Sequence, residues 1–216
     1  MNLLIPYQEL LEAIVEELEV KSGEKILEAG CGTGNLALKI KEKGAEVVGL
    51  DNCKEALEIY SKKDNSVNTI LADLSKKLPF SNNFFDKIAS NNTLYSFSKE
   101  KQKEILMELR RILKPGGKTV IANPKKGWSP LKIYFEGIKK NKEKDGLGQT
   151  IIKVLKIIVP TLKILFYNAR IKKEAQYCFL TPEEQEEILR GAGFSDVSKA
   201  KYVYAEQGIM NSGIKL

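Results

Sequence analysis

The chain has 216 residues, of which 43% are hydrophobic and 29% charged, and its formal net charge is +7. These values are typical of one globular domain with a substantial core, and they exclude a disordered or fibrous chain. The three cysteines are too few and too scattered for a disulfide framework or a zinc site.

The first predicted element is an N-terminal helix. Apolar residues recur at helical spacing from Tyr7 to Leu18, so we place this helix over residues 6–19. The first ten residues include Pro6 and lack the basic start of a signal peptide. We therefore expect a cytoplasmic protein.

A glycine-rich loop follows a short apolar run over residues 25–29. Gly30, Gly32 and Gly34 occupy alternate positions, and a helical pattern over residues 35–43 comes next. Glycine permits left-handed backbone and lets a ligand lie against the chain, while the first helical turn offers free N–H groups. The pattern predicts a strand, a cofactor-binding loop and a helix.

Two residues beside this loop indicate which cofactor it binds. Asn35 stands where the dinucleotide fingerprint has a third Gly or Ala, and Glu28 places a carboxylate directly before the loop. A carboxylate there would repel a pyrophosphate but attract the ammonium group of S-adenosylmethionine. The residues therefore favour S-adenosylmethionine over NAD.

Two strands with acidic ends follow. The strand over residues 46–50 ends at Asp51, whose carboxylate can accept hydrogen bonds from both ribose hydroxyls or can cap the next helix. The strand over residues 69–72 precedes Asp73, which is either an acceptor for an adenine amino group or a turn residue.

The next elements complete the first half of the chain. A strand over residues 84–90 runs into Asn91, where either the backbone or the side chain is expected to contact the cofactor. An amphipathic helix over residues 100–113 ends at the Lys-Pro-Gly-Gly sequence of residues 114–117, and a fifth strand is expected over residues 118–122. This alternation of strands and helices predicts a mainly parallel sheet with helices on both faces.

A long insertion separates this half from the last elements. Residues 128–144 are expected to form a helix, and residues 151–166 are strongly apolar with interspersed lysines and the helix-breaking Pro160. The second stretch is too short and too charged to span a bilayer. We interpret residues 123–180 as a helical lid over an acceptor pocket, with a membrane-surface contact or a dimer interface as alternatives.

Positive charge is concentrated in this insertion. Residues 125–173 hold 13 Lys or Arg against 3 Asp or Glu, whereas the rest of the chain holds 22 against 25. The whole excess therefore comes from one segment. Such an asymmetry indicates an acidic partner or surface, and a peripheral contact with an anionic membrane is one form of it.

The C-terminal part predicts one helix and two strands. Residues 181–190 begin with an N-cap threonine, a proline at the first helical position and a capping-box glutamate. Short strands are expected within residues 195–205 and 207–216, the last of them antiparallel. Residues 202–206 are an alternative place for the final strand.

Five segments carry a resemblance to a known family. They are EAGCGTG, GLDNC, LADLSKKLPF, FDKIASNNTLY and LRRILKPGGKTVIANP. In this order they resemble the motifs of the class I S-adenosylmethionine-dependent methyltransferases, most of all the small-molecule and quinone-type branch that includes the methyltransferase type 11-like proteins. The resemblance is strong over residues 7–124 and loose over residues 181–216.

The resemblance implies an α/β, Rossmann-like three-layer sandwich. Its sheet is expected to have seven mainly parallel strands with an antiparallel last strand, plus the helical lid insertion. We expect a single methyltransferase domain over residues 1–216. Its parts are the helix at 6–19, a cofactor-binding half at 24–122, the lid at 123–180 and the C-terminal helix and strands at 181–216.

The expected cofactor residues lie in the glycine loop and after the next three strands. No metal is expected. The residues are Glu28, Gly30, Cys31, Gly32, Gly34, Asp51, Asn52, Asp73, Leu74 and Asn91.

Methyl transfer from a sulfonium needs alignment of the acceptor and exclusion of water. A hydroxyl or carbon acceptor is also helped by a general base. Many relatives carry His where this chain has Tyr95, and this chain has no His. Tyr95 and Tyr7 are therefore the candidate bases, and the alternative for each is a packing residue in the pocket wall.

The range of possible methyl acceptors is narrowed by motifs that the sequence lacks. No Asn-Pro-Pro-aromatic motif follows the strand at residues 84–90, and no Pro-Cys pair occurs. These absences argue against methylation of nucleobase amines, glutamine or RNA cytosine C5. We expect a small apolar or amphipathic acceptor such as a lipid or quinone. The alternatives are an RNA methyltransferase that uses residues 125–173 and a catalytically silent S-adenosylmethionine-binding partner protein.

Overall fold

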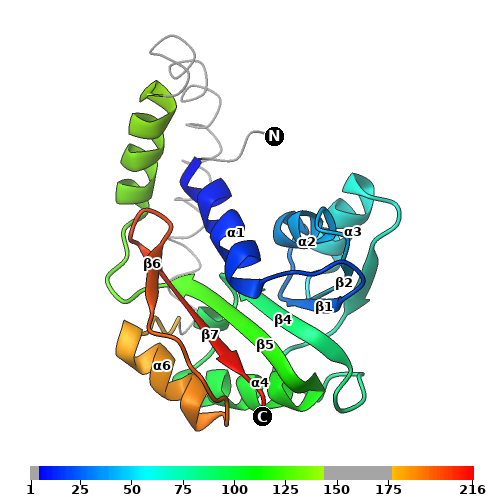
Figure 1. Ribbon diagram of the computed structural model, residues 1–216. Coiled ribbons are helices and arrows are strands. Elements are labelled where there is room, and N and C mark those ends of the chain that lie inside the picture. Colours follow the sequence, from blue (N-terminus) through cyan, green and yellow to red (C-terminus); the bar gives the residue numbers. More distant parts are fainter. Residues whose placement is uncertain (1–4, 144–176) are drawn as a thin grey trace.

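A seven-stranded sheet forms the centre of the computed structural model, which describes residues 5–143 and 177–216 (Figure 1). Apolar runs bounded by glycine, proline and polar turns provide the strands. The strands are β1 (Lys25–Ala29), β2 (Glu46–Asp51), β3 (Asn68–Leu71), β4 (Phe85–Asn91), β5 (Leu113–Pro124), β6 (Lys201–Val203) and β7 (Gly208–Ile214).

The strand order is β3-β2-β1-β4-β5-β7-β6. Strands β1 to β5 pair in parallel, whereas β7 is antiparallel to both β5 and β6. This confirms the predicted mainly parallel sheet with an antiparallel last strand. The order reverses direction between β1 and β4, and sheets of this kind bind ligands at the carboxyl ends of the strands at such a point.

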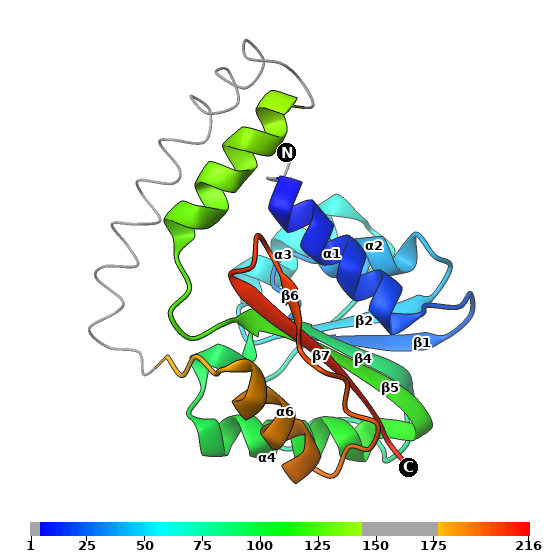
Figure 2. The ribbon, with the colours of Figure 1, turned by 60° about the vertical axis from the view of Figure 1, so that its left-hand side comes forward.

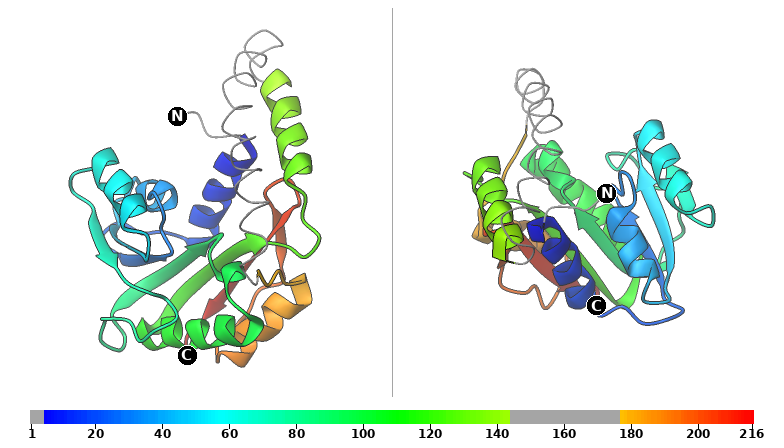
Figure 3. Two further views of the ribbon diagram at one scale, coloured as in Figure 1. Left: turned by 180° about the vertical axis from the view of Figure 1, so that it is seen from behind. Right: turned by 90° about the horizontal axis from the view of Figure 1, so that it is seen from above.

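Helices cover both faces of the sheet (Figures 2 and 3). One layer contains α1, α2 and α3, and the other contains α4 and α6. The helices are α1 (Ile5–Leu18), α2 (Asn35–Lys41), α3 (Lys54–Lys63), α4 (Lys99–Ile112) and α6 (Pro182–Gly191), with a short 3-10 helix η1 (Leu94–Ser96) after β4.

Each face has its own apolar core. On β1, Ile26 packs with the α1, α2 and α3 layer, whereas Leu27 packs with the α4 and α6 layer. Successive strand residues point to opposite faces, so one buried strand contributes to both cores. Glu28 therefore shares the face of Ile26 and points toward α2.

The prediction for the fifth strand was too short. We expected residues 114–117 to end the preceding helix, but β5 begins at Leu113 and includes them. Leu113 pairs with Phe85 across a shift in register, and Gly116 adopts a φ of +74° beside that irregularity. Strand pairing therefore draws the Pro-Gly-Gly sequence into a bulged strand.

The terminal helices match the predictions closely. Helix α1 spans Ile5–Leu18 instead of 6–19, and α6 begins after an N-cap Thr181 with the capping box complete. Strands β6 and β7 lie within the two predicted windows. The alternative placement of the final strand at residues 202–206 is wrong, because β7 pairs with β5 from Gly208 onward.

The insertion is described only in part. Residues 130–143 are helical, so this helix starts two residues later than expected, with Pro130 at the first helical position. Lys140 ties it to α1 through hydrogen bonds of 2.6 and 2.7 Å from its ammonium nitrogen to the Glu9 carboxylate. The predicted apolar stretch at residues 151–166 lies outside the described residues, as does most of the basic segment. Within the described ranges, every helix is too short or too polar to cross a membrane.

Candidate cofactor and acceptor site

A cavity of about 300 Å³ opens where the carboxyl ends of β1, β2 and β4 meet. The glycine loop after β1 forms one side of it, and the turn after β4 forms another. The structure therefore gathers most of the predicted site residues around one space. The predicted residues that line it are Tyr7, Glu28, Gly30, Cys31, Gly32, Asp51 and Asn91.

The three loop glycines are required for different reasons. Their φ angles are +79° at Gly30, +50° at Gly32 and +75° at Gly34, a region that side chains disfavour. A Cβ atom at Gly30 would lie 2.3 Å from the Thr93 side chain, and one at Gly34 would lie 2.2 Å from the Tyr60 ring. A Cβ at Gly32 would meet no atom of the described residues within 4 Å. Gly32 is therefore the glycine that keeps space open.

Asp51 braces this loop from the end of β2. Its Oδ2 accepts a 2.8 Å hydrogen bond from the Gly32 N–H, and its Oδ1 accepts a 2.9 Å bond from the Cys53 N–H. Each carboxylate oxygen has two acceptor positions, so both oxygens keep one for a ligand hydroxyl. The carboxylate can thus hold the loop and bind a diol at the same time.

Glu28 is buried at the base of the cavity with an exposed fraction of 3%. Its Oε2 accepts a 2.7 Å hydrogen bond from the Ala37 N–H in α2. Burial raises the pKa of Glu28 to about 8, although the hydrogen bond from Ala37 lowers it, and the charges of Asp51 and Lys63 have smaller, opposing effects. A cationic ligand group in the cavity would supply the positive charge that this carboxyl lacks.

Asn91 provides a test of whether the cavity suits a polar ligand. Its side-chain oxygen is buried and has no hydrogen-bond partner among the described residues. Buried polar atoms are almost always paired, so an orphaned acceptor at a cavity wall indicates a missing donor. An ammonium group, which donates and cannot accept, fits both Asn91 and Glu28. This pair of acceptors therefore fits the ammonium group of S-adenosylmethionine.

Other predicted residues lie outside the lining of this cavity. Gly34 is buried against Tyr60, and Asn52 is exposed. Asp73 accepts a 2.8 Å hydrogen bond from the Ser75 N–H, which is the turn role that the sequence left open, and Leu74 is buried in the core. For these residues the structure describes local roles only.

Tyr95 lies in an aromatic cluster formed by Tyr95, Trp128, Tyr177 and Phe179. Its ring stacks on Phe179 with centroids 5.2 Å apart and lies 5.6 Å from Tyr177, while Trp128 lies 6.0 Å from Phe179. Burial raises the pKa of Tyr95, and the nearby Tyr177 adds to the rise. The phenol therefore stays protonated near neutral pH, which disfavours it as a general base.

Tyr7 reaches the cavity from α1. The Asn35 side-chain nitrogen donates a long 3.5 Å hydrogen bond to its hydroxyl oxygen, and the Lys63 ammonium donates a 2.7 Å bond to Oδ1 of the same Asn35. Burial raises the pKa of Tyr7, the Asn35 bond opposes this, and Glu28 adds to it. Tyr7 is consequently also a protonated phenol.

Sequence reasoning missed several residues of this site. Thr93 and Ser96 line the cavity, and Asn35 does so although we used it only to exclude NAD. Lys63 reaches the glycine loop from α3. In the sequence it resembles any other solvent-facing lysine of that helix. The position after β4 and the position after the third loop glycine are local signals that could have identified Thr93 and Asn35. No local pattern marks Lys63.

Comparisons with known proteins agree with this geometry. A family model described as a methyltransferase domain matches residues 26–117. A demethylmenaquinone methyltransferase of Thermus thermophilus is 31% identical over 186 residues, which cover 81% of this chain and 76% of that protein. An uncharacterized methyltransferase of Synechocystis is 30% identical over 126 residues, which cover 56% of this chain and 59% of that protein. This chain thus spans less than two thirds of the Synechocystis protein.

The fold also matches solved structures. An S-adenosylmethionine-dependent methyltransferase from Aquifex aeolicus superposes with a TM-score of 0.64 at 17% identity, covering 95% of this chain and 89% of that one. The sheet order and the loop between β1 and α2 therefore define an α/β fold of the methyltransferase type. The chain belongs to the S-adenosylmethionine-dependent methyltransferase family, as its identity and coverage with the Thermus protein show.

Proposed function

We propose that this protein transfers a methyl group from S-adenosylmethionine to a small, apolar acceptor of the quinone type. The observation that carries the proposal is the pairing of two features at one edge of the sheet. One is the cavity with Glu28, Asp51 and the glycine loop. The other is the aromatic cluster that contains Tyr95, a residue of the short helix after β4. The first suits the cofactor, and the second suits a planar apolar ring.

The cofactor roles follow from the contacts around the cavity. Glu28 and the Asn91 side-chain oxygen would hold the ammonium group, and Asp51 would accept hydrogen bonds from the ribose hydroxyls. Gly32 would allow the ligand to lie against the backbone. Asp73 and Leu74 remain proposals for the adenine end. When bound, S-adenosylmethionine supplies a methyl group already activated by the sulfonium.

The acceptor side is proposed from chemistry and from relatives. The Thermus relative is named for demethylmenaquinone, a quinone. The rings of Tyr95, Phe179 and Trp128 offer apolar faces of matching size. Because Tyr95 and Tyr7 are held protonated, we propose that they align the acceptor by packing and hydrogen bonding instead of removing its proton.

Calorimetry tests the cofactor half of the proposal. S-Adenosylhomocysteine should bind the wild-type protein, and NAD should not. Asp51→Ala should weaken the binding by about 1.5–3 kcal/mol, the value of a hydrogen bond to a charged group. Glu55→Ala is the control, because Glu55 is an exposed acid on α3. NAD binding, or unchanged affinity in Asp51→Ala, would contradict the assignment.

Product analysis tests the acceptor half. The protein is incubated with methyl-labelled S-adenosylmethionine and either a short-chain demethylnaphthoquinol or total cellular RNA. Label should enter the quinol and not the RNA. Tyr95→Phe should keep the rate within a few-fold of the wild type, because the ring stays in place. A loss of 100-fold or more with intact cofactor binding would restore Tyr95 as the base.

A further inference from the structure

The hairpin turn between β6 and β7 has an unusual backbone. Tyr204, Ala205 and Glu206 have φ angles of +55°, +54° and +59° in succession. Left-handed backbone is unfavourable for residues with a Cβ and normally occurs singly, at glycine or asparagine. Three such residues in a row cost free energy, so the surrounding structure must impose the conformation.

Gln207 fixes this turn in place. Its exposed fraction is 6%, and its N–H and Nε2 donate hydrogen bonds of 3.1 and 3.2 Å to the Tyr204 and Ala205 carbonyls. Its Oε1 accepts a 2.9 Å bond from the Ser129 N–H, and its carbonyl accepts a 3.0 Å bond from the Lys125 N–H. The turn is thereby attached to the chain that leaves β5 and leads to Trp128.

The turn directs the Tyr204 side chain toward the candidate site. The ring centroid of Tyr204 lies 6.0 Å from that of Tyr7, which lines the cofactor cavity. Burial raises the pKa of Tyr204 to about 12, and the phenols of Tyr7 and Tyr95 add to the rise. Three phenols from separate elements thus lie near one another, and Tyr204 keeps its proton to donate.

We propose that Tyr204 is an acceptor-binding residue whose ring packs on a planar acceptor and whose hydroxyl donates a hydrogen bond to a carbonyl oxygen of that acceptor. This inference rests on the proposed function and deepens it. The strained turn gives the hairpin a role beyond closing the sheet, because a relaxed turn would not hold the ring against Tyr7. The acceptor class is a flat ring that carries a carbonyl or quinone oxygen.

A fluorescence titration tests the proposal without requiring turnover. Trp128 is the only tryptophan of the sequence and belongs to the aromatic cluster, so a quinone bound there should quench its emission. The probe is 2,3-dimethyl-1,4-naphthoquinone, whose blocked ring positions do not react with the exposed thiol of Cys53. It should bind the wild-type protein saturably.

Variants of the two hairpin tyrosines give a matched comparison. Tyr204→Ala should raise the Kd of the probe at least tenfold, and Tyr204→Phe should raise it about three- to tenfold through loss of one hydrogen bond. Tyr202→Phe should leave the Kd unchanged, because Tyr202 is 57% exposed and its ring lies beneath the Lys125 ammonium. Circular dichroism checks that each variant is folded. If Tyr204→Ala does not fold, the affinity of Tyr204→Phe alone tests the proposal.

A glycine substitution separates binding from stability. Ala205→Gly should raise Tm by about 2–4 °C, because glycine accepts the left-handed backbone without strain. The same change should raise the Kd of the probe at least threefold, because the relaxed turn no longer fixes Tyr204. Ala200→Gly is the control and should lower Tm, since Ala200 is not among the left-handed residues.

The outcomes are distinct. Wild-type affinity for the probe in Tyr204→Ala and Tyr204→Phe would overturn the proposal, and so would a wild-type protein that does not bind the probe. A more stable Ala205→Gly variant with unchanged affinity would limit the turn to a structural role and also overturn it. Failure of the proposed function would be seen separately, as loss of S-adenosylhomocysteine binding by the wild-type protein.

Discussion

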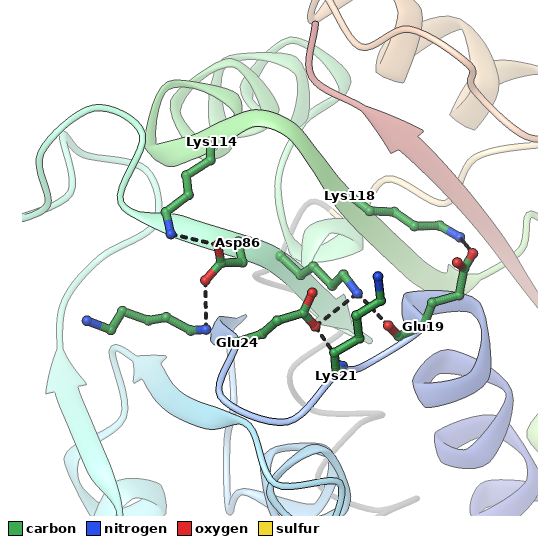
Figure 4. Close-up of polar contacts among 8 residues, drawn as sticks. Glu19, Lys21, Glu24, Asp86, Lys114 and Lys118 are labelled. Carbon is green, nitrogen blue, oxygen red and sulfur yellow. Dashed lines mark hydrogen bonds and ion pairs between the residues drawn. The ribbon is translucent and has the colours of Figure 1, made fainter.

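The two ends of the parallel strands treat acidic residues in opposite ways. At the cofactor end, where β1, β2 and β4 finish, Glu28 is buried and accepts a hydrogen bond from the backbone N–H of Ala37. At the ion-paired end, where β1, β4 and β5 begin, acids alternate with lysines (Figure 4). At the cofactor end, a carboxyl group is left for a ligand to pair with. At the ion-paired end, the acidic residues pair with lysines of the protein itself.

The ion-paired end holds several lysine–carboxylate pairs. The Lys87 ammonium lies 2.9 Å from Oε2 of Glu24, and the Lys114 ammonium lies 2.6 Å from Oδ1 of Asp86. The Lys118 ammonium lies 2.6 Å from Oε1 of Glu19. Lys87 has an exposed fraction of only 9%, so its pair with Glu24 counts for more than an exposed pair would.

The pKa values record this difference. Burial raises the pKa of Glu28 to about 8, and the hydrogen bond from the Ala37 N–H and the charge of Lys63 do not offset it. For Glu17, burial acts in the same direction, but hydrogen bonds from Lys201, Ser212 and Lys118 outweigh it and lower the pKa to about 2. The fold therefore disfavours the ionised form of the buried carboxyl at the cofactor end, whereas lysines stabilise the ionised form of Glu17 elsewhere.

The largest effect is expected from adding one methyl group to the cofactor end. Gly34→Ala places a Cβ 2.2 Å from the Tyr60 ring in a left-handed backbone, so it should lower the free energy of unfolding by about 2–5 kcal/mol. Gly32→Ala is the matched variant, with backbone strain of about 1–2 kcal/mol and no clash. Denaturant unfolding measures both.

The two glycine variants should rank differently for binding. Gly32 lines the cavity, so its added methyl group should displace a ligand even though the protein remains folded. Calorimetry with S-adenosylhomocysteine should therefore show a large loss for Gly32→Ala at modest cost in stability. Equal stability loss in both variants would mean that the loop relaxes and that Tyr60 does not restrict it.

The next largest effect concerns Glu28, the buried acid at the cofactor end. The folded-state pKa of Glu28 is about 8, above the unfolded value, so the folded protein holds an extra proton between roughly pH 4.5 and pH 8. Stability of the ligand-free protein should fall as pH rises through this window. Glu28→Gln cannot ionise, so it should be more stable than the wild type at pH 9 and similar near pH 4.

The Glu28→Gln variant should also bind the cofactor more weakly. Glu28→Gln keeps an acceptor for the Ala37 N–H but loses the charge for an ammonium group, so affinity for S-adenosylhomocysteine should fall by about 1.5–3 kcal/mol. Thermal unfolding at pH 4, 7 and 9 and calorimetry at pH 7 measure the two effects. A variant that is less stable at pH 9 would contradict the raised pKa.

The sequence predicted the fold well wherever local signals agreed. Strand β1 has the predicted bounds Lys25–Ala29, because a polar turn precedes it and the glycine loop follows it. Strand β5 was misjudged, because Pro115 and Gly116 read as a turn until pairing with β4 is known. Register is set by the neighbouring strand, and no local pattern in residues 113–117 contains it.

The candidate site was also predicted only in part, because some of its residues are brought there by packing and not by local sequence. Glu28, Asp51 and Asn91 follow or end strands that neighbour one another, so their meeting follows from strand order. Tyr204 and Lys63 reach the site from elements far away in the chain, through a turn of unusual backbone and a long side chain. Their positions depend on tertiary packing, which periodicity and motif spacing do not encode.

At the ion-paired end, a moderate effect is expected from removing one charge. Glu24→Gln leaves the buried Lys87 ammonium without its carboxylate partner, so the free energy of unfolding should fall by about 1–3 kcal/mol. Glu46→Gln is the control, because its contact with Lys25 is 3.9 Å long and its side chain is 71% exposed. Denaturant unfolding should show almost no change there. Equal losses would mean that burial does not distinguish these pairs.

The smallest effect tests the sign of the pKa shift at Glu17. Its folded-state pKa of about 2 lies below the unfolded value, so its stabilising contribution is present above roughly pH 4.5 and is lost as pH falls toward 2. Glu17→Gln should therefore cost about 1–2 kcal/mol at pH 7, where the Lys118 and Lys201 ammonium groups lie 3.2 and 2.5 Å from the carboxylate. The difference from the wild type should shrink steadily between pH 5 and pH 2. Glu28→Gln should differ from the wild type with the opposite sign, because that variant becomes more stable than the wild type as pH rises. Thermal unfolding of both variants across one pH series would therefore test the contrast between the two ends of the sheet, and a difference of the same sign in both variants at high pH would contradict it.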